Sequence, residues 1–226
     1  MKTFSSILKS LPSAKVIDST IDYSKYIPLD LSVTNKELYE NKLENAEDFE
    51  IFISNFLTKN NGKVAYGGYI EGRNIYKRSI IFKNDYITER NIHIGLDLWI
   101  EAETPVLAAL DGKLHSFKNN AGLGDYGPTI ILEHLAENEK FYTLYGHLSL
   151  ESIKNLTVGT FYKKGEEIAT VGNSEVNGEY APHLHFQIIK NIENYWGDYP
   201  GVCSRNDLNF YIENCPDPNL LLKIHK

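Results

Sequence analysis

The chain has 226 residues, of which 42% are hydrophobic and 12% aromatic, enough for a packed core and too apolar for wholesale disorder. Its formal net charge of −7 argues against non-specific binding to nucleic acid, which needs clustered lysine and arginine side chains. No run approaches the ~20 apolar residues that span a membrane.

The first residues have only weak features of a signal peptide. The apolar stretch there is interrupted by Lys9, Pro12 and Lys15, whereas a signal peptide needs a continuous apolar run of ~7–15 residues. We therefore expect the protein to remain in the cytoplasm, with export by another route left open. Cys203 and Cys215 are too few for a disulfide framework. We expect two partly buried thiols and leave a single disulfide open.

An apolar stripe predicts a helix after the polar stretch at 34–48. Phe49, Phe52 and Phe56 recur at helical spacing, and Asn60-Asn61-Gly62 is a suitable stop. We expect an irregular, partly helical region over residues 1–60. Its preferred interpretation is a segment that wraps the main domain, and the sharper alternative is a lid or inhibitory segment.

Short β-branched, aromatic or alternating segments then predict strands. They are residues 63–70, 79–82, 95–100, 105–110, 113–117, 129–135, 140–148, 167–172 and 183–189. Asp111-Gly112 predicts a tight hairpin turn, and Ser149 is expected to cap a short helix over 149–156. We predict a mainly β fold, α+β overall, with an antiparallel β-sandwich or open barrel and a partly helical N-terminal region.

Histidines in strand-like context indicate a metal site. His183 and His185 are one residue apart, and in an extended strand they share a face. His93 and Asp97 are four apart at the start of another strand and have the same parity. Two imidazoles and a carboxylate suit Zn²⁺ and leave a fourth position for water. Neither pair is diagnostic alone, but together, with His147 between them in the sequence, they favour a metal centre.

The remaining histidines have ordinary interpretations. We expect His115 to be exposed, His134 to be a buried, hydrogen-bonded core residue, and His225 to lie in a mobile tail. Motifs of serine hydrolases, nucleotide-binding loops and His-Glu-x-x-His metallopeptidases do not occur. The glycine-rich stretch at 122–127 is interpreted as a loop.

A resemblance sharpens this interpretation. The segments "HIGLDLWIEAETPVLAALDGKL", "YGPTIILEH", "FYTLYGHLS", "GTFYKKGEEIATVG" and "APHLHFQI" resemble the lysostaphin/LytM-type zinc metallopeptidases, which cleave peptidoglycan cross-links. The similarity covers about residues 91–189, and all three family motifs occur in order. It implies a mainly antiparallel β core with a narrow groove that holds one Zn²⁺ per chain.

The resemblance also implies roles for individual residues. His93 and Asp97 match the first two zinc ligands and His185 matches the third. His147 and His183 match the two catalytic histidines that do not bind the metal. Which of these two acts as the base is left open.

The flanks and the loops qualify this resemblance. The segments "YGGYIEGRNIY" and "GDYPGVC…CPDPNLLL" resemble metallopeptidase-like domains that are joined to aminotransferase and kinase domains in larger proteins. Three features depart from the common family pattern: Gln187 replaces glutamate, the loop at 172–182 is long, and Pro128 replaces asparagine. None of them is a ligand, so they affect the shape of the groove. Tyr145, Tyr69 and Arg73 are our candidates for groove residues, and Glu71 belongs to the same upstream segment.

The sequence therefore predicts three parts: an N-terminal wrapping or lid region (1–85), a zinc metallopeptidase-like β domain (86–191) and a C-terminal extension packed on it (192–226). The expected function is zinc-dependent metalloendopeptidase activity by metal-activated water. The expected substrates are peptidoglycan-type or related small peptides. The alternative is a non-catalytic zinc- or ligand-binding regulatory module on the same fold. No nucleic-acid partner is expected, and the oligomeric state is left open.

Overall fold

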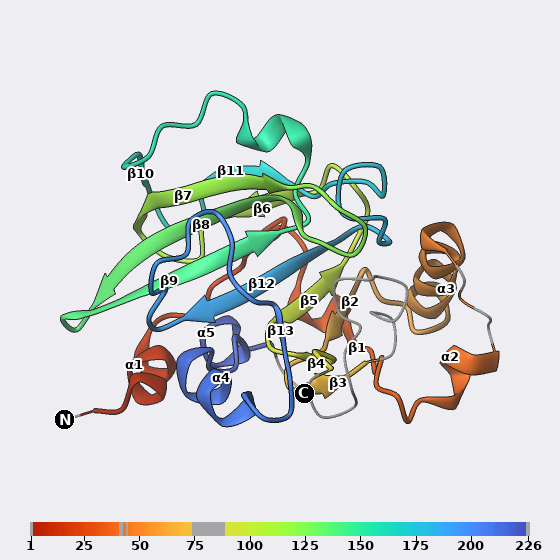
Figure 1. The fold of residues 1–226 in the computed structure, drawn as a ribbon. Coiled ribbons are helices and arrows are strands. Elements are labelled where there is room, and N and C mark those ends of the chain that lie inside the picture. The colour runs from red at the N-terminus through yellow and green to blue at the C-terminus, as the bar shows by residue number, and fades with distance from the viewer. Residues whose placement is uncertain (1, 41–42, 44, 74–88, 225–226) are drawn as a thin grey trace.

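A large twisted sheet forms the centre of the protein (Figure 1). The structure is a computed structural model that describes residues 2–40, 43, 45–73 and 89–224; the predicted strand at 79–82 and His225 lie outside them. In this part of the chain the main sheet has eight strands, which in spatial order are β1 (Tyr26–Pro28), β2 (Val64–Gly67), β5 (Leu96–Trp99), β12 (His183–Ile189), β9 (Glu139–Gly146), β8 (Gly127–Ala136), β7 (Gly112–Asn120) and β10 (Phe161–Tyr162).

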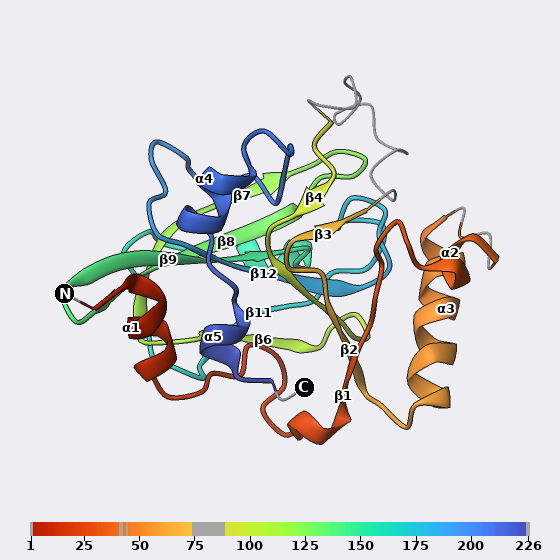
Figure 2. The same ribbon diagram turned by 90° about the horizontal axis from the view of Figure 1, so that it is seen from below.

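Two small sheets and several helices surround the main sheet. The small sheets pair β6 (Pro105–Leu107) with β11 (Glu167–Thr170), and β4 (Ile92–His93) with β3 (Glu71–Gly72) and β13 (Val202–Cys203). The helices are α1 (Phe4–Ser10), α2 (Lys36–Glu40), α3 (Ala46–Lys59), α4 (Leu208–Asn214) and α5 (Asn219–Leu222), with short 3-10 helices at Tyr23–Lys25 and Leu150–Ile153. None of the described helices has the length and apolarity needed to cross a membrane. Figure 2 shows α3 beside β2 at one end of the molecule and α1 next to α5 towards the other.

The predicted fold class is confirmed, because strands and the large sheet dominate the chain. Neighbouring strands of the main sheet are antiparallel except for β1 and β2, which are parallel. Within the described residues β1 and β10 are edge strands, so the sheet is open and not a closed barrel.

The N-terminal region adds both strands and a helix to this framework. The predicted helix is confirmed as α3; the Asn45 side chain accepts a hydrogen bond from the backbone N–H of Asp48, and the helix ends at Lys59. Its apolar stripe packs on a cluster that includes Leu31, Ile53 and Trp99. This cluster ties α3 to β5, so the N-terminal region is continuous with the sheet that carries the candidate site.

Side chains alternate along each strand, so the two faces of the sheet carry different residues. On β12, Leu184 and Phe186 point into the main core, whereas His183 and His185 point to the opposite face. Asp97 shares that opposite face because it is the register partner of His185. The candidate site therefore lies on the face away from the main core.

Two smaller clusters flank the site on this face. On one side is the N-terminal cluster around Leu31 and Trp99. On the other side the C-terminal extension packs Tyr199, Cys203 and Cys215 against the strands. Both cysteines are buried free thiols. The site thus occupies the gap that the two flanking clusters leave on the sheet.

The hairpin predicted at Asp111-Gly112 is wrong. Strand β6 pairs with β11, and β7 pairs with β8 and β10, so the chain passes from one sheet to another at this point. Long-range contacts fix the bend: the Asp111 carbonyl accepts from His134 Nδ1 at 2.9 Å, and its carboxylate accepts from the Lys164 backbone N–H at 2.8 Å. The predicted cap is confirmed, since Ser149 Oγ accepts from the Ser152 backbone N–H at 3.3 Å.

His134 is buried as predicted, and this gives the fold a pH-dependent contribution to stability. Burial lowers the pKa of His134 to about 4 from an ordinary value of 6.5. Between these values the unfolded chain binds a proton that the folded chain does not, so stability falls as the pH falls. We expect the wild type to lose up to about 3 kcal/mol through this group. A His134→Gln variant should lose correspondingly less in urea unfolding between pH 6.5 and 4; parallel losses in both proteins would contradict this.

Candidate metal centre

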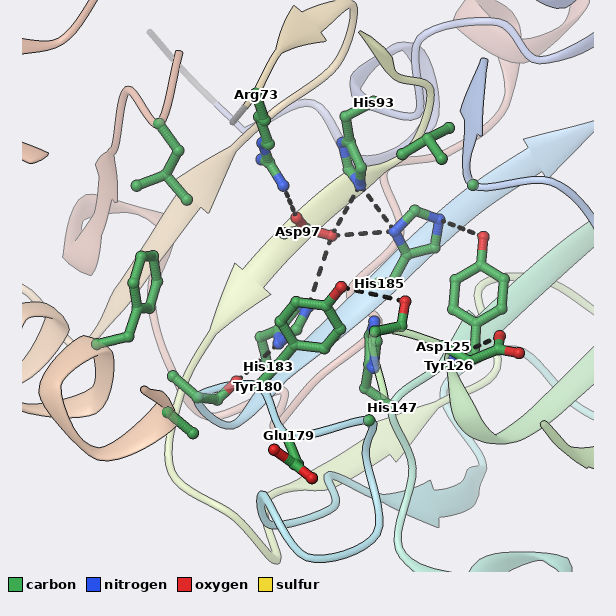
Figure 3. A pocket seen from close by; sticks show the side chains of 18 of the residues that line it. Arg73, His93, Asp97, Asp125, Tyr126, His147, Glu179, Tyr180, His183 and His185 are labelled. Carbon is green, nitrogen blue, oxygen red and sulfur yellow. Dashed lines mark hydrogen bonds and ion pairs between the residues drawn. The ribbon is translucent and has the colours of Figure 1, made fainter. Parts of the chain in front are cut away.

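Three buried donor atoms from three strands meet on the open face of the sheet (Figure 3). His93 Nε2 lies 2.9 Å from His185 Nδ1 and 3.2 Å from Asp97 Oδ1, and His185 Nδ1 lies 3.0 Å from the same oxygen. His185 packs closely against the backbone between β4 and β5, and this depends on Gly95, where a Cβ would lie 2.4 Å from the imidazole Cε1.

The protonated nitrogen of His93 is fixed by the backbone. Its Nδ1 lies 2.9 Å from the carbonyl oxygen of Gly68, which can only accept, so Nδ1 carries the proton. Burial lowers the pKa of His93 to about 4 despite the adjacent Asp97 carboxylate, so the ring is neutral at pH 7. Its Nε2 therefore faces the other two atoms with a lone pair.

Gln187 fixes the protonated nitrogen of His185 in the same way. The Gln187 amide nitrogen donates to the Pro200 carbonyl at 3.1 Å and to Cys215 Sγ at 3.3 Å, which directs its oxygen to His185. That oxygen is 2.9 Å from His185 Nε2, so Nε2 carries the proton. The lone pair of His185 Nδ1 is then aimed at His93 and Asp97.

With both imidazoles in their neutral form, the cluster holds three electron-pair donors with no proton between them. Three such atoms about 3 Å apart repel one another unless a cation lies among them. Ligands of a tetrahedral zinc ion with bonds of 2.0–2.1 Å are about 3.3 Å apart, close to the spacing here. The donor set and its dimensions fit a small divalent cation.

A buried ion pair orients the carboxylate of this cluster. Arg73 Nη1 donates to Asp97 Oδ2 at 2.6 Å, and Arg73 Nε donates to Glu71 Oε2 at 2.6 Å. Although burial by itself raises the pKa of Asp97, interactions with His93 and the Arg73 guanidinium hold it well below its usual range. Asp97 is thus a carboxylate with Oδ2 occupied and Oδ1 turned to the two imidazoles.

A second pair of histidines lies next to the cluster. The His147 and His183 ring centroids are 4.2 Å apart, and His183 Nε2 is 4.0 Å from Asp97 Oδ1. His147 Nδ1 donates to the Asn177 carbonyl and His183 Nδ1 donates to the Ala181 carbonyl, each at 2.8 Å. Burial lowers the pKa of both rings, and His183 adds to the effect on His147. Both present a neutral, unprotonated Nε2.

These four histidines line a pocket of about 500 Å³. Two loops meet above the rings: the Gly124 N–H donates to the Gly178 carbonyl at 2.9 Å, and the Tyr180 hydroxyl donates to the Gly124 carbonyl at 3.1 Å. The Tyr180 ring stands edge-on to His147 at 5.2 Å. Tyr126 OH lies 3.3 Å from His185 Nε2. The pocket therefore combines a metal-type donor set, two further imidazoles and an aromatic cover.

Comparison with known proteins relates this constellation to a peptidase family. Residues 91–195, just under half of the chain, match Peptidase family M23. We call this matched stretch the M23 domain. The predicted resemblance to lysostaphin/LytM-type enzymes is confirmed, and the matched residues contain both histidine pairs and the aspartate of the pocket.

Individual relatives match the M23 domain and little else. An uncharacterized metalloprotease of Haemophilus influenzae is 35% identical over 95 residues, which is 42% of this chain and 18% of the relative. Lysostaphin of Staphylococcus staphylolyticus is 33% identical over 100 residues, 44% of this chain and 19% of the relative. The match thus spans less than a fifth of each relative. The solved catalytic domain of lysostaphin from Staphylococcus simulans is 27% identical, with a TM-score of 0.36, covering 54% of this chain and 80% of that one.

The structure separates the predicted groove residues. Arg73 lies in the pocket of the M23 domain, bonded to Asp97. Tyr145 is completely buried in the main core, where its hydroxyl accepts from the Ala109 backbone N–H. Tyr69 OH donates to the Cys215 carbonyl and lies outside the residues that line the pocket. Neither tyrosine is therefore placed to meet a ligand in the pocket.

His115 is half-buried, which corrects the prediction that it is exposed. Its ring centroid lies 5.0 Å from that of Tyr142, edge-on, and 5.3 Å from that of Trp196, at a tilt, and no local pattern predicts these contacts.

Sequence reasoning missed several residues of the pocket. Tyr126 and Tyr180 belong to the loops at 122–127 and 172–182, and the unusual length of the second loop was the only available signal. Trp99 lies two residues after Asp97 on the same strand face, and its ring stacks on His183 at 5.6 Å. Strand parity alone could have identified Trp99 as a neighbour of the site.

Gln187 is expected to control metal affinity without touching the metal. Replacing it with leucine removes the acceptor that fixes His185, and loss of such a partner typically lowers metal affinity 10–100-fold. A Gln187→Glu variant keeps an acceptor for His185 Nε2 and should stay within about tenfold of wild type. Zinc titration against a chromophoric chelator compares the three proteins. Wild-type affinity in Gln187→Leu would show that the amide does not position His185.

Proposed function

We propose that the M23 domain is a zinc-dependent metalloendopeptidase in which His93, Asp97 and His185 hold one zinc ion. The observation that carries the proposal is the triangle of three unprotonated donor atoms, completed on one side by His147 and His183. Two imidazoles with one carboxylate are a common catalytic zinc set, which leaves a coordination position for water or substrate.

The residues of the pocket divide the chemistry of peptide hydrolysis. Bound zinc supplies Lewis acidity, which polarises the scissile carbonyl and brings the pKa of an adjacent water down towards ~7. His147 and His183 each present an unprotonated Nε2, so either can accept a proton from that water. Neither can donate to a developing oxyanion until it has itself been protonated. One therefore serves as the base, and the imidazolium that results stabilises the negative charge.

We propose short peptides, of the peptidoglycan type or related to it, as substrates. The resemblance to lysostaphin supports this class, as does a pocket of about 500 Å³, which has room for a few residues.

We also propose the three-part organisation at residues 1–85, 86–191 and 192–226, in which both flanking parts pack against the M23 domain and bound its pocket. The cluster that joins Leu31 to Trp99 and the cluster that joins Tyr199 and Cys215 to Leu144 support this.

Hydrolysis of defined peptides tests the proposal. Zinc-loaded protein is incubated with a peptide library and a muropeptide digest, and new amino termini are detected by mass spectrometry. The proposal predicts cleavage that a chelator abolishes, that added zinc restores and that a His147→Ala variant lacks. If zinc-loaded protein cleaves no peptide, the regulatory-module alternative replaces the enzyme.

A further inference from the structure

One wall of the pocket is built by the N-terminal region and not by the M23 domain. The residues before Arg73 that line the pocket are Ser32 and six apolar ones. Four of the apolar residues are Leu31 and Val33, which follow β1, Leu38 on α2, and Phe49 on α3, and we refer to these four as the N-terminal wall. Other parts of the pocket lining carry polar and aromatic groups, among them Asp125, Glu179 and Tyr180.

The N-terminal wall is fixed relative to the donor cluster by hydrogen bonds. The Leu31 N–H donates to Glu71 Oε1 at 3.0 Å, while the other Glu71 oxygen accepts from Arg73, which in turn binds Asp97. The Val33 N–H donates to the Gly72 carbonyl at 2.9 Å. A continuous chain of hydrogen bonds therefore joins the wall to Asp97, one of the three donor residues, and holds the wall in a fixed position beside the site.

Trp99 connects the N-terminal wall to the second histidine pair. It packs in one cluster with Leu31, and Leu38 and Phe49 pack against the same cluster. The Trp99 ring also stacks on His183 with an interplanar angle of 19°. Trp99 and Leu31 are themselves nearly buried, so the apolar surface that a ligand can reach comes from Leu38, Phe49 and Val33, the last of which is 40% exposed.

We infer that the N-terminal wall is a specificity subsite that selects a bulky apolar side chain next to the scissile bond. The inference rests on the proposed function and names its substrate class. A peptide with its carbonyl at the donor cluster has its flanking side chain within reach of the wall. A glycyl peptide leaves this apolar surface uncovered, whereas a leucyl side chain buries it and removes its own surface from water. Peptides with an apolar flanking residue are therefore preferred over glycine-rich peptides.

A binding measurement tests the N-terminal wall separately from catalysis. The probes are the hydroxamates of N-acetylglycine and N-acetylleucine, whose two oxygens chelate a metal and hold both compounds in one place. Their difference in affinity for zinc-loaded protein then reports the side chain alone. Calorimetry should give a dissociation constant at least about tenfold lower for the leucine compound, which corresponds to burial of one aliphatic side chain.

Matched variants locate the preference on the wall. Val33→Asn places an amide in the wall at an exposed position and should reduce the leucine-to-glycine ratio by about fivefold. Ile51→Asn makes the same kind of change on α3, at a 54% exposed residue outside the pocket, and should leave the ratio unchanged.

The outcomes separate this inference from the proposed function. Tighter binding of the leucine compound by a protein that cleaves no peptide would refute the peptidase proposal but support the N-terminal wall as an apolar binding subsite. Equal binding of the two compounds would overturn the wall whatever the hydrolysis assay gives, whereas binding of neither would overturn the zinc site on which both proposals rest. A ratio that Val33→Asn leaves at its wild-type value would place the preference elsewhere in the pocket.

Discussion

Replacing His147 or His183 with alanine is expected to lower kcat by at least about 100-fold while the bound zinc remains at the wild-type level. The reason lies in the hydrogen bonds of the two rings. Each is anchored through Nδ1 to a backbone carbonyl and offers only Nε2 to the pocket, so neither contributes a donor to the His93–Asp97–His185 triangle. In the proposed mechanism their loss removes proton transfer and leaves the donor triangle in place.

Two readouts keep this prediction specific. Zinc content of the purified variants shows whether the triangle survives, and single-turnover rates show whether the chemical step is lost. A His134→Ala variant is the matched control, because His134 is also a buried histidine but lies in the main core, bonded to Asp111. Near wild-type turnover in either His147→Ala or His183→Ala would remove that histidine from the mechanism. Loss of zinc in both would mean that they hold the metal.

Replacing Arg73 with methionine is expected to destabilise the metal-free protein by about 3–5 kcal/mol, the usual effect of leaving one partner of a buried ion pair alone. Arg73 and Asp97 have side chains that are each 2% exposed, and their charged atoms are 2.6 Å apart. The variant leaves the Asp97 carboxylate buried without its guanidinium. A metal cation beside Oδ1 compensates for part of that loss, so zinc should stabilise the variant more than it stabilises the wild type.

Thermal and urea unfolding, each with and without zinc, measure this effect. The matched control is Lys118→Met, which breaks the exposed ion pair with Asp198 at 3.7 Å and should change stability by less than about 1 kcal/mol. Similar losses in the two variants would show that burial of the Arg73–Asp97 pair carries no special energy. An Arg73→Met protein that responds to zinc like the wild type would uncouple Arg73 from the metal centre.

Local pattern was enough to predict the parts of the site that lie on regular strands. The alternation of β12 separates His183 and His185 from Leu184 and Phe186, and the structure has this separation. The helical spacing of the phenylalanines likewise predicted α3. In these segments the intrinsic periodicity and the tertiary contacts agree, so the sequence alone is informative.

The predictions that failed depended on contacts between distant segments or on irregular backbone. Tyr145 was assigned to the groove by counting strand parity back from His147, but β9 ends at Gly146 and His147 has a left-handed φ of 61°, so the parity does not carry across. The turn at Asp111-Gly112 failed because the partner of β6 is β11, much later in the chain. No local pattern identifies such a partner.

The N-terminal wall shows the same limit for function. Its four residues have the composition of an ordinary apolar core, and no local pattern indicates that they face a pocket. What makes them part of the site is the bond from Leu31 to Glu71 and the shared packing with Trp99. Both contacts join segments that are far apart in the chain.

Metal content per chain tests the central claim most directly. The protein is purified without metal-chelating resin, and zinc is measured by mass spectrometry beside a His93→Ala/His185→Ala variant. Three unprotonated donor atoms in one buried triangle predict close to one zinc per wild-type chain and none in the variant. A wild-type protein that contains no zinc and does not bind added zinc would contradict the account, because the triangle would then be a structural histidine cluster.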